Sequence, residues 1–266
     1  MRKITINLAA VAAFCIVVAS PALVSSSCAT PKTEQEDTTI IREDSGITAL
    51  KYSSPEVPAS IEFCGKTIDL SRFDRHERMD RELLAFTYMH STSLQMLKKA
   101  NRYFPIVEPI LKENGIPDDF KYLMVIESNM NPTARSSAGA AGLWQFMQGT
   151  GRDYGLEVNN NVDERYHIEK ATRAACRYLK DAYAKYKDWV AVAASYNAGQ
   201  ARIASQLAKQ DVDDSLDLQL VEETARYVYR ILAAKQLFNA PTTFGFRLRA
   251  SDLYPPIPYT EITVTK

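Results

Sequence analysis

The residue with the clearest chemical potential in this sequence is Glu127, which directly follows the apolar run of residues 123–126, Leu-Met-Val-Ile. A carboxyl group at the end of a buried helix resists ionisation, because removal from water disfavours its charged form. A carboxyl group that stays protonated near neutral pH can act as a general acid. A lone glutamate at a helix end is more often a solvated charge, so the catalytic interpretation depends on the residues that accompany it.

Two segments after Glu127 carry groups that suit the binding of a sugar. Ser136 and Ser137 can donate hydrogen bonds, and the small residues 139–142, Gly-Ala-Ala-Gly, allow a ring to approach the backbone closely. Residues 143–147, Leu-Trp-Gln-Phe-Met, add aromatic surface and an amide. Glycine-rich turns and aromatic residues also serve ordinary structural purposes, so these segments gain meaning only in combination.

Two later segments complete the set. Residues 194–199, Ala-Ser-Tyr-Asn-Ala-Gly, end a predicted helix in Asn and Gly residues that tolerate a left-handed backbone. Glu223 and Tyr227 are one helical turn apart, so their side chains share one face of a predicted helix. The sequence thus offers one candidate acid together with hydroxyl, amide and aromatic side chains that could accompany it.

Together, and in this order, the segments resemble the catalytic domain of the soluble lytic transglycosylase type, glycoside hydrolase family 23. The resemblance covers about residues 100–240 and is carried by Glu127-Ser128, Gly-Leu-x-Gln, Tyr-Asn-Ala-Gly and Glu-Thr-x-x-Tyr-Val. Trp144 stands where many members of the family have methionine. The LysM wall-binding repeats that some related enzymes carry at the C-terminus do not occur in this sequence, which favours a lipid anchor.

The resemblance implies a role for each matching position. Glu127 would be the single acid/base, and a tyrosine hydroxyl would hold its carboxyl group in place. Ser136 would contact either that carboxyl group or the substrate, with Ser137 as the neighbouring alternative. The substrate-binding positions that the family likeness implies are Ser136, Gly142, Leu143, Gln145, Tyr196, Asn197 and Tyr227.

The implied reaction needs a single carboxylate. Most glycosidases use two, roughly 5 to 9.5 Å apart, whereas the matching motifs offer Glu127, and Asp118 and Asp119 precede it by two turns on the same predicted helix. The family likeness implies a lyase that cleaves the β-1,4 bond between N-acetylmuramic acid and N-acetylglucosamine and leaves 1,6-anhydromuramic acid ends. Two alternatives remain: a goose-type lysozyme-like hydrolase, favoured by a second carboxylate across the cleft, and a non-catalytic peptidoglycan-binding scaffold.

The elements that must position these residues begin with a strand pair. Strand-like residues 61–64 and 67–70 flank a Gly-Lys turn. Helical periodicity then extends over residues 75–102. Pro105 and Pro109 are expected to interrupt the short helix that follows, because proline removes a helical hydrogen bond.

Helices dominate the rest of the chain. Pro117, followed by two aspartates, predicts the start of the helix that leads to Glu127. Further helices are expected at residues 142–153, 168–187, 188–197, 200–209 and 220–239. The sequence therefore predicts a mainly α domain with minor β flanks, and the family likeness implies a lysozyme-like helical fold of the goose-type lysozyme kind.

The first residues have the features of an export signal. Arg2 and Lys3 precede the apolar and small residues 8–19, a run too short to span a bilayer. Two ways of processing this signal fit the sequence: cleavage after Ser26, or lipidation of Cys28 within a loose bacterial lipoprotein box. The polar segment that follows resembles a flexible tether and favours the second way, which places the protein in the bacterial envelope as an exported, periplasmic, membrane-anchored lipoprotein.

Composition excludes several function classes. The 266 residues include 32 basic and 32 acidic side chains, so the chain lacks the basic excess that nucleic-acid binding requires. Three histidines, four cysteines and the absence of nucleotide-binding or zinc motifs predict no metal, nucleotide or other cofactor. The expected partners are peptidoglycan glycan strands and, through the lipid, a membrane. The predicted organisation is a signal peptide (1–28), a flexible linker (29–60), an N-terminal hairpin and helix (61–99), the catalytic domain (100–241) and a C-terminal tail (242–266).

Overall fold

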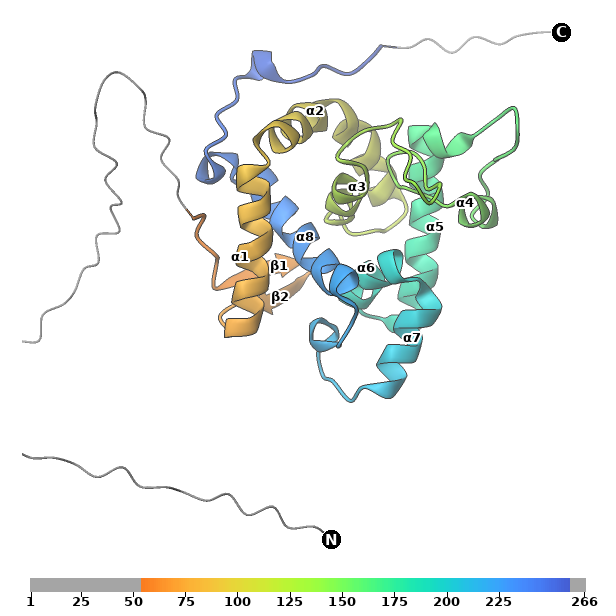
Figure 1. The fold of residues 1–266 in the computed structure, drawn as a ribbon. Coiled ribbons are helices and arrows are strands. Elements are labelled where there is room, and N and C mark those ends of the chain that lie inside the picture. The colour runs from red at the N-terminus through yellow and green to blue at the C-terminus, as the bar shows by residue number, and fades with distance from the viewer. Residues whose placement is uncertain (1–53, 259–266) are drawn as a thin grey trace, which may run out of the picture. The chain divides into compact units, whose positions relative to one another are not determined.

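A computed structural model describes residues 54–258. The predicted signal peptide, Cys28 and most of the predicted linker lie outside the described residues. Figure 1 shows a mainly helical domain with one small strand pair, which confirms the predicted fold class. The helices are α1 (Phe73–Tyr88), α2 (His90–Glu113), α3 (Phe120–Ser128), α4 (Gln148–Asp153), α5 (Ile168–Tyr186), α6 (Trp189–Ala198), α7 (Gln200–Lys209) and α8 (Glu222–Asn239).

The two strands form the predicted hairpin. β1 (Ser60–Phe63) pairs antiparallel with β2 (Lys66–Asp69). The two residues between them, Cys64 and Gly65, both have positive φ, as the tightest hairpin turns require. Phe63 is almost fully buried, and its ring centroid lies 6.0 Å from that of Phe120 at the start of α3. The hairpin therefore covers the beginning of the helix that carries Glu127.

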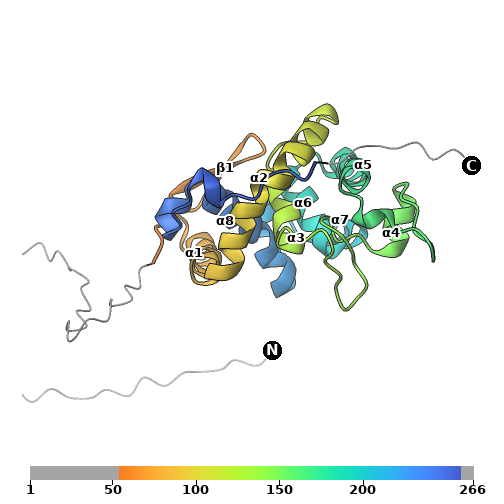
Figure 2. The same ribbon diagram turned by 90° about the horizontal axis from the view of Figure 1, so that it is seen from above.

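Helix α3 lies at the centre of the domain. Seven of its nine residues are buried, because its sequence is apolar on every side. It packs against α2 and α8 (Figures 1 and 2), and α8 also packs against α1 and α6. The helix ends where Asn129 and Met130 both adopt a left-handed backbone, which a helix cannot continue. This ending places Glu127 in the last turn.

The structure corrects two expectations about the first helices. The periodic stretch 75–102 is divided between α1 and α2, because Met89 has φ −82° and ψ 50° and so leaves the helical region. Pro105 and Pro109 do not interrupt a helix but lie within α2. Both are exposed, so water can satisfy the carbonyl groups that lose their N–H partners.

Two further boundaries differ from the prediction. Helix α3 begins at Phe120 rather than Pro117, after a turn in which the Phe120 N–H donates to the Pro117 carbonyl at 3.1 Å. Of the expected helix 142–153, only α4 is helical. Gly142 and Gln145 have φ values of 79° and 48°, which a right-handed helix excludes.

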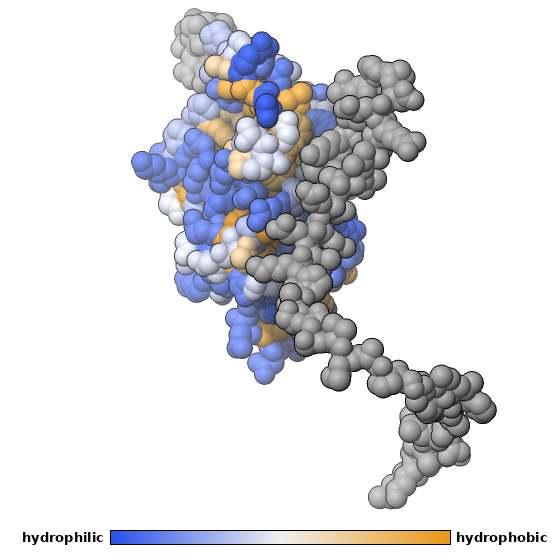
Figure 3. Space-filling view, turned by 90° about the vertical axis from the view of Figure 1, so that its left-hand side faces the viewer, coloured by the Kyte–Doolittle hydropathy of each residue, from blue (hydrophilic) through white to orange (hydrophobic). Residues whose placement is uncertain are grey.

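Hydrophilic residues predominate on the coloured part of the face in Figure 3, and the apolar residues visible there gather mainly near its upper end, with smaller areas below. Among the helices of residues 54–258, none is both long enough and apolar enough to cross a bilayer.

Candidate active site

Glu127 meets α8 at the end of α3. Its side chain keeps a partly exposed edge, while its carboxyl group is enclosed mostly by protein. The hydroxyl of Tyr227, on α8, donates a hydrogen bond to Oε1 of Glu127. Burial raises the pKa of Glu127 to about 7, although this hydrogen bond and the charge of Arg230 lower it, and the charge of Glu223 adds a further increase. At neutral pH the carboxyl group can therefore both donate and accept a proton.

Two tyrosines enclose this carboxyl group. Burial and the charge of Glu127 raise the pKa of Tyr227 and of Tyr196 well above the ordinary value, so both phenols stay protonated. The Tyr196 hydroxyl donates to the Trp144 carbonyl at 2.8 Å, which joins α6 to the loop after α3. Of the two, Tyr227 is the direct partner of Glu127.

A polar chain links the end of α6 to the start of α8. The Thr224 hydroxyl donates to Oδ1 of Asn197 at 2.8 Å, and Nδ2 of Asn197 donates to Oε1 of Glu223 at 3.4 Å. Asn197 therefore holds α6 and α8 in a fixed relation. Because Tyr196 precedes it on α6 and Tyr227 follows on α8, this link positions both tyrosines.

The loop that precedes α4 is braced by three of the predicted site residues. Nε2 of Gln145 donates to the carbonyls of Gly142 at 2.8 Å and Ala134 at 3.2 Å. A Cβ on Gly142 would lie 1.9 Å from the carbonyl oxygen of Arg165, so only glycine fits there. Leu143 is buried with 2% of its surface exposed. These contacts shape the loop from inside.

Ser136 lies in the same loop but on its exposed side. Its hydroxyl accepts a hydrogen bond from the Ala140 N–H at 3.0 Å, and its own N–H donates to the Ala140 carbonyl at 2.9 Å. Ser137 is exposed as well. The structure thus brings Glu127 together with Tyr227, and the side-chain hydrogen bond of Ser136 stays within its loop.

Part of the chain that carries this arrangement is similar to a known family. Residues 105–217 match the family described as Transglycosylase SLT domain. This segment of the chain therefore resembles a transglycosylase SLT domain. The matched residues include Glu127, the braced loop, Tyr196 and Asn197, whereas α8, which supplies Tyr227, lies beyond the match.

Two curated proteins that resemble this chain are named as transglycosylases of murein or peptidoglycan. The chain is 30% identical over 181 residues to the membrane-bound lytic murein transglycosylase D of Escherichia coli K12, which covers 66% of this chain and 39% of that protein. It is 30% identical over 138 residues to the peptidoglycan transglycosylase gp16 of Escherichia phage T7, covering 50% of this chain and 10% of the phage protein. The chain therefore spans less than half the length of these relatives.

Solved structures give a weaker likeness. The 70 kDa soluble lytic transglycosylase SLT70 from Escherichia coli aligns with a TM-score of 0.46 and 21% identity, covering 58% of this chain and 27% of that structure.

Sequence reasoning missed Arg165, whose side chain supports the braced loop through hydrogen bonds. The side chain is buried with 4% exposure and forms two hydrogen bonds with Asp163, at 2.9 and 2.6 Å. Its Nη1 atom donates to the carbonyls of Gly139 at 2.8 Å and Phe146 at 3.0 Å, at the two ends of the braced segment. An arginine in a polar stretch of sequence gives no signal of such a role, because its contacts are made with a distant loop.

Arg230 was missed as well, although the sequence holds a signal for it. It follows Tyr227 by three residues on α8, so helical spacing places both on the same side of the helix. Its Nη2 atom donates to the Ile126 carbonyl at 3.5 Å, directly beside Glu127. It is the positive charge that opposes the rise in the pKa of Glu127.

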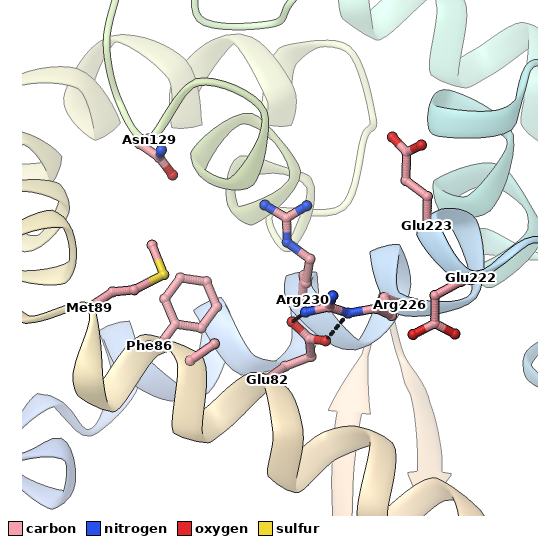
Figure 4. A pocket seen from close by; sticks show the side chains of 9 residues that line it. Glu82, Phe86, Met89, Asn129, Glu222, Glu223, Arg226 and Arg230 are labelled. Carbon is pink, nitrogen blue, oxygen red and sulfur yellow. Dashed lines mark hydrogen bonds and ion pairs between the residues drawn. The ribbon is translucent and has the colours of Figure 1, made fainter.

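A cavity of about 600 Å³ is lined in part by Glu223 and Arg230, the two residues whose charges act on Glu127 (Figure 4). Apart from Asn129, its lining comes from α1, Met89 and α8, which lie outside the matched residues. The lining residues are Glu82, Ala85, Phe86, Met89, Asn129, Glu222, Glu223, Arg226 and Arg230. Within residues 54–258, no cluster of three or more His, Cys, Asp or Glu side chains is arranged to hold a metal ion.

Proposed function

We propose that this protein is a peptidoglycan lytic transglycosylase in which Glu127 is the single acid/base. The observation that carries the proposal is the enclosed carboxyl group of Glu127, with a pKa of about 7 and a hydrogen bond from Tyr227. The SLT domain and the names of its relatives support the class of reaction.

The reaction follows from the two protonation states of one residue. Protonated Glu127 donates its proton to the glycosidic oxygen between N-acetylmuramic acid and N-acetylglucosamine, and the bond from that oxygen to C1 breaks. The resulting carboxylate then accepts the proton of the muramic acid 6-hydroxyl while the hydroxyl oxygen bonds to C1. The products are a free 4-hydroxyl and a 1,6-anhydro end, Glu127 returns to its protonated form, and water is not consumed.

The other predicted residues serve this chemistry in two ways. Tyr227 holds the carboxyl group of Glu127, and Tyr196 and Asn197 fix the helices around it. The braced loop presents the sugar-binding face, with Gly142, Leu143 and Gln145 maintaining its shape and Ser136 on its exposed side. These substrate-binding roles are part of the proposal.

The principal test is Glu127→Gln, which keeps the shape of the side chain but removes the exchangeable acid. General acid/base catalysis contributes about 100- to 10,000-fold, so cleavage of purified peptidoglycan should fall by at least that factor. Glu113→Gln is a matched control, because Glu113 ends α2 but has 62% of its side chain exposed. A Glu127→Gln variant that retains more than about a tenth of wild-type turnover would show that another group is the catalyst.

One observation favours a second candidate function. Glu223 lies close enough to Glu127 for its charge to raise the pKa of that residue, so a second carboxylate is available for a goose-type lysozyme-like hydrolase. Mass spectrometry of the released fragments separates the two reactions, since anhydro and hydrated ends differ by one water. Glu223→Gln adds a second criterion: it should abolish a hydrolase that uses Glu223 as base, but leave the single-acid reaction in place.

We also propose that Cys28, which lies outside the described residues, carries a lipid that anchors the enzyme in the envelope. Stable anchoring requires at least two acyl chains, so mass spectrometry of the N-terminal peptide should show them on Cys28. A Cys28→Ser variant should leave the membrane fraction but still cleave isolated wall material. Wild-type protein that partitions into the aqueous phase without lipid mass would indicate cleavage after Ser26 instead.

A further inference from the structure

A buried ion pair joins α8 to α1, a helix that lies before the residues matched by the SLT family. Arg226, on α8, donates from Nε and Nη2 to the two carboxylate oxygens of Glu82, on α1, at 2.6 and 3.2 Å. Figure 4 shows the two side chains facing each other across these hydrogen bonds. Glu82 is only 2% exposed, so water has little access to its carboxylate. Because two hydrogen bonds from a planar guanidinium group fix direction as well as distance, the pair holds the two helices in one orientation.

Arg226 directly precedes Tyr227, which donates its hydroxyl proton to Oε1 of Glu127. Adjacent side chains on a helix point about 100° apart, so Arg226 reaches α1 while Tyr227 reaches α3. A rotation of α8 that breaks the first contact therefore displaces the second as well. The orientation that Glu82 gives to α8 thus determines where the Tyr227 hydroxyl lies.

The other polar contacts at this end of α8 do not replace the pair. Thr224 contacts Asn197, so it ties the first turn of α8 to α6. Glu222 pairs with Arg81 of α1, but their side chains are 69% and 54% exposed. An exposed pair fixes geometry poorly, because water competes for both charges and both side chains keep other rotamers. Of these two ion pairs between α1 and α8 within residues 54–258, the one formed by Glu82 is buried.

We propose that Glu82 is a positioning residue of the active site, which acts through Arg226 to hold the Tyr227 hydroxyl against Glu127. Misplacement of a catalytic contact by about 1 Å can cost about 100-fold in rate, so the pair would control turnover without touching the reacting bond. The inference rests on the proposed function. It also extends the working unit beyond the residues that resemble the SLT domain, since α1 precedes them and α8 follows them.

The groups around Glu127 fix the direction of the expected change. Tyr227 and Arg230 lower its pKa from α8, whereas burial and the charge of Glu223, also on α8, raise it. Tyr196, on α6, has a pKa well above the ordinary value and adds no charge. When Tyr227 moves away, Glu127 loses the hydrogen bond that favours its charged form, so its pKa rises. A general loss of stability lowers the folded fraction but leaves this pKa unchanged.

The first experiment measures the pKa of Glu127 without catalysis. Arg226→Lys keeps the positive charge beside Glu82 but replaces the planar fork with a single ammonium group. The carboxyl carbon of Glu127 in the full chain is followed by carbon-13 NMR as pH changes, with Glu127→Gln to assign its signal. Its midpoint should rise by about 1. Arg81→Lys is the matched control, because it alters the exposed pair between the same two helices, and it should keep the wild-type midpoint.

A second variant keeps the test decisive if Arg226→Lys does not fold. Glu82→Leu combined with Arg226→Met removes both charges and the directed contact. Replacement of a buried ion pair by apolar side chains of similar size is often neutral or stabilising, so this double variant should stay folded. Its Glu127 midpoint should also rise. A wild-type midpoint in either folded variant would overturn the proposal.

The final experiment connects the pair to turnover of purified peptidoglycan. In Arg226→Lys, kcat should fall at least about tenfold, and the pH-rate profile should shift upward with the pKa of Glu127. In a Tyr227→Phe background the same substitution should produce no further shift, because the hydroxyl through which it acts is gone. An equal shift in both backgrounds would show a route that bypasses Tyr227 and would contradict the proposal. If the wild-type protein does not cleave peptidoglycan, the proposed function fails, while the NMR titration still tests the link between Glu82 and Glu127.

Discussion

Removal of the Tyr227 hydroxyl should change the pH at which the enzyme works. In Tyr227→Phe, Glu127 loses the hydrogen bond that favours its charged form. A hydrogen bond to a charged group contributes about 1.5 to 3 kcal/mol, which corresponds to a rise of roughly 1 to 2 in pKa. Glu127 should therefore titrate at about 8 to 9 in the variant rather than at about 7.

The consequence can be read from a pH-rate profile. Because the first step requires protonated Glu127, kcat/KM of the wild-type enzyme should fall as pH rises through about 7. In Tyr227→Phe this fall should begin at the higher pKa, and the maximal rate should drop roughly 10- to 100-fold because the carboxyl group is less well oriented. The assay is the initial rate of fragment release from purified peptidoglycan across the neutral and alkaline range.

A second tyrosine supplies the control for this experiment. The Tyr178 hydroxyl donates to the Ser195 carbonyl at 2.9 Å, so Tyr178→Phe also removes a buried hydrogen bond, but not one to Glu127. Its profile should keep the wild-type midpoint. If Tyr227→Phe loses activity while its profile still falls near pH 7, the hydrogen bond does not set the pKa of Glu127 and the reasoning is wrong.

Three further predictions concern stability. Folding raises the pKa of Glu127 from 4.5 to about 7, so the unfolding free energy of the wild-type protein falls by about 3 kcal/mol as pH rises through this interval. In chemical denaturation, Glu127→Gln should therefore be more stable than wild type at pH 8 but not at pH 4. Gly142→Ala should lower the unfolding free energy by at least about 2 kcal/mol, because its Cβ would overlap the Arg165 carbonyl. Gly65→Ala, also at positive φ but in open space, should lower it by only about 1 kcal/mol. Equal losses in the two variants would contradict the overlap. Arg165→Gln should destabilise the domain by about 3 kcal/mol and lower the thermal midpoint, and an unchanged midpoint would show that the loop holds without it.

The helices after residue 168 were largely predictable from sequence, because their periodicity and caps agree. Asp188 accepts a hydrogen bond from the Val190 N–H at the start of α6, and Gly199 separates α6 from α7. The segment 142–147 was not predictable in the same way. Its residues have helical periodicity, but Gly142 and Gln145 have a left-handed backbone, and Gly142 packs closely against the Arg165 carbonyl, a contact that depends on the tertiary fold.

The residues of the candidate site also include some that the sequence predicted and some that it did not. Glu127 was predicted as the acid because it ends an apolar run and is accompanied by motifs that resemble one family, and Tyr227 was predicted because the family motif contains it. The environment of Glu127 was less accessible to sequence reasoning. Arg230 acts from another helix, and the cavity needs Glu82 and Met89, whose sequence neighbourhood carries no catalytic pattern.

The hydrogen bond between Tyr227 and Glu127 joins residues that are 100 positions apart. A chain that emerges from the ribosome or through a membrane with its N-terminus first exposes Glu127 long before α8 follows. Until then the carboxyl group lacks the enclosing wall of α8, remains hydrated, and keeps the ordinary acidity of a glutamate. For the proposed function, the acid is thus completed only when nearly the entire domain has been delivered, and an unfinished chain should be inactive.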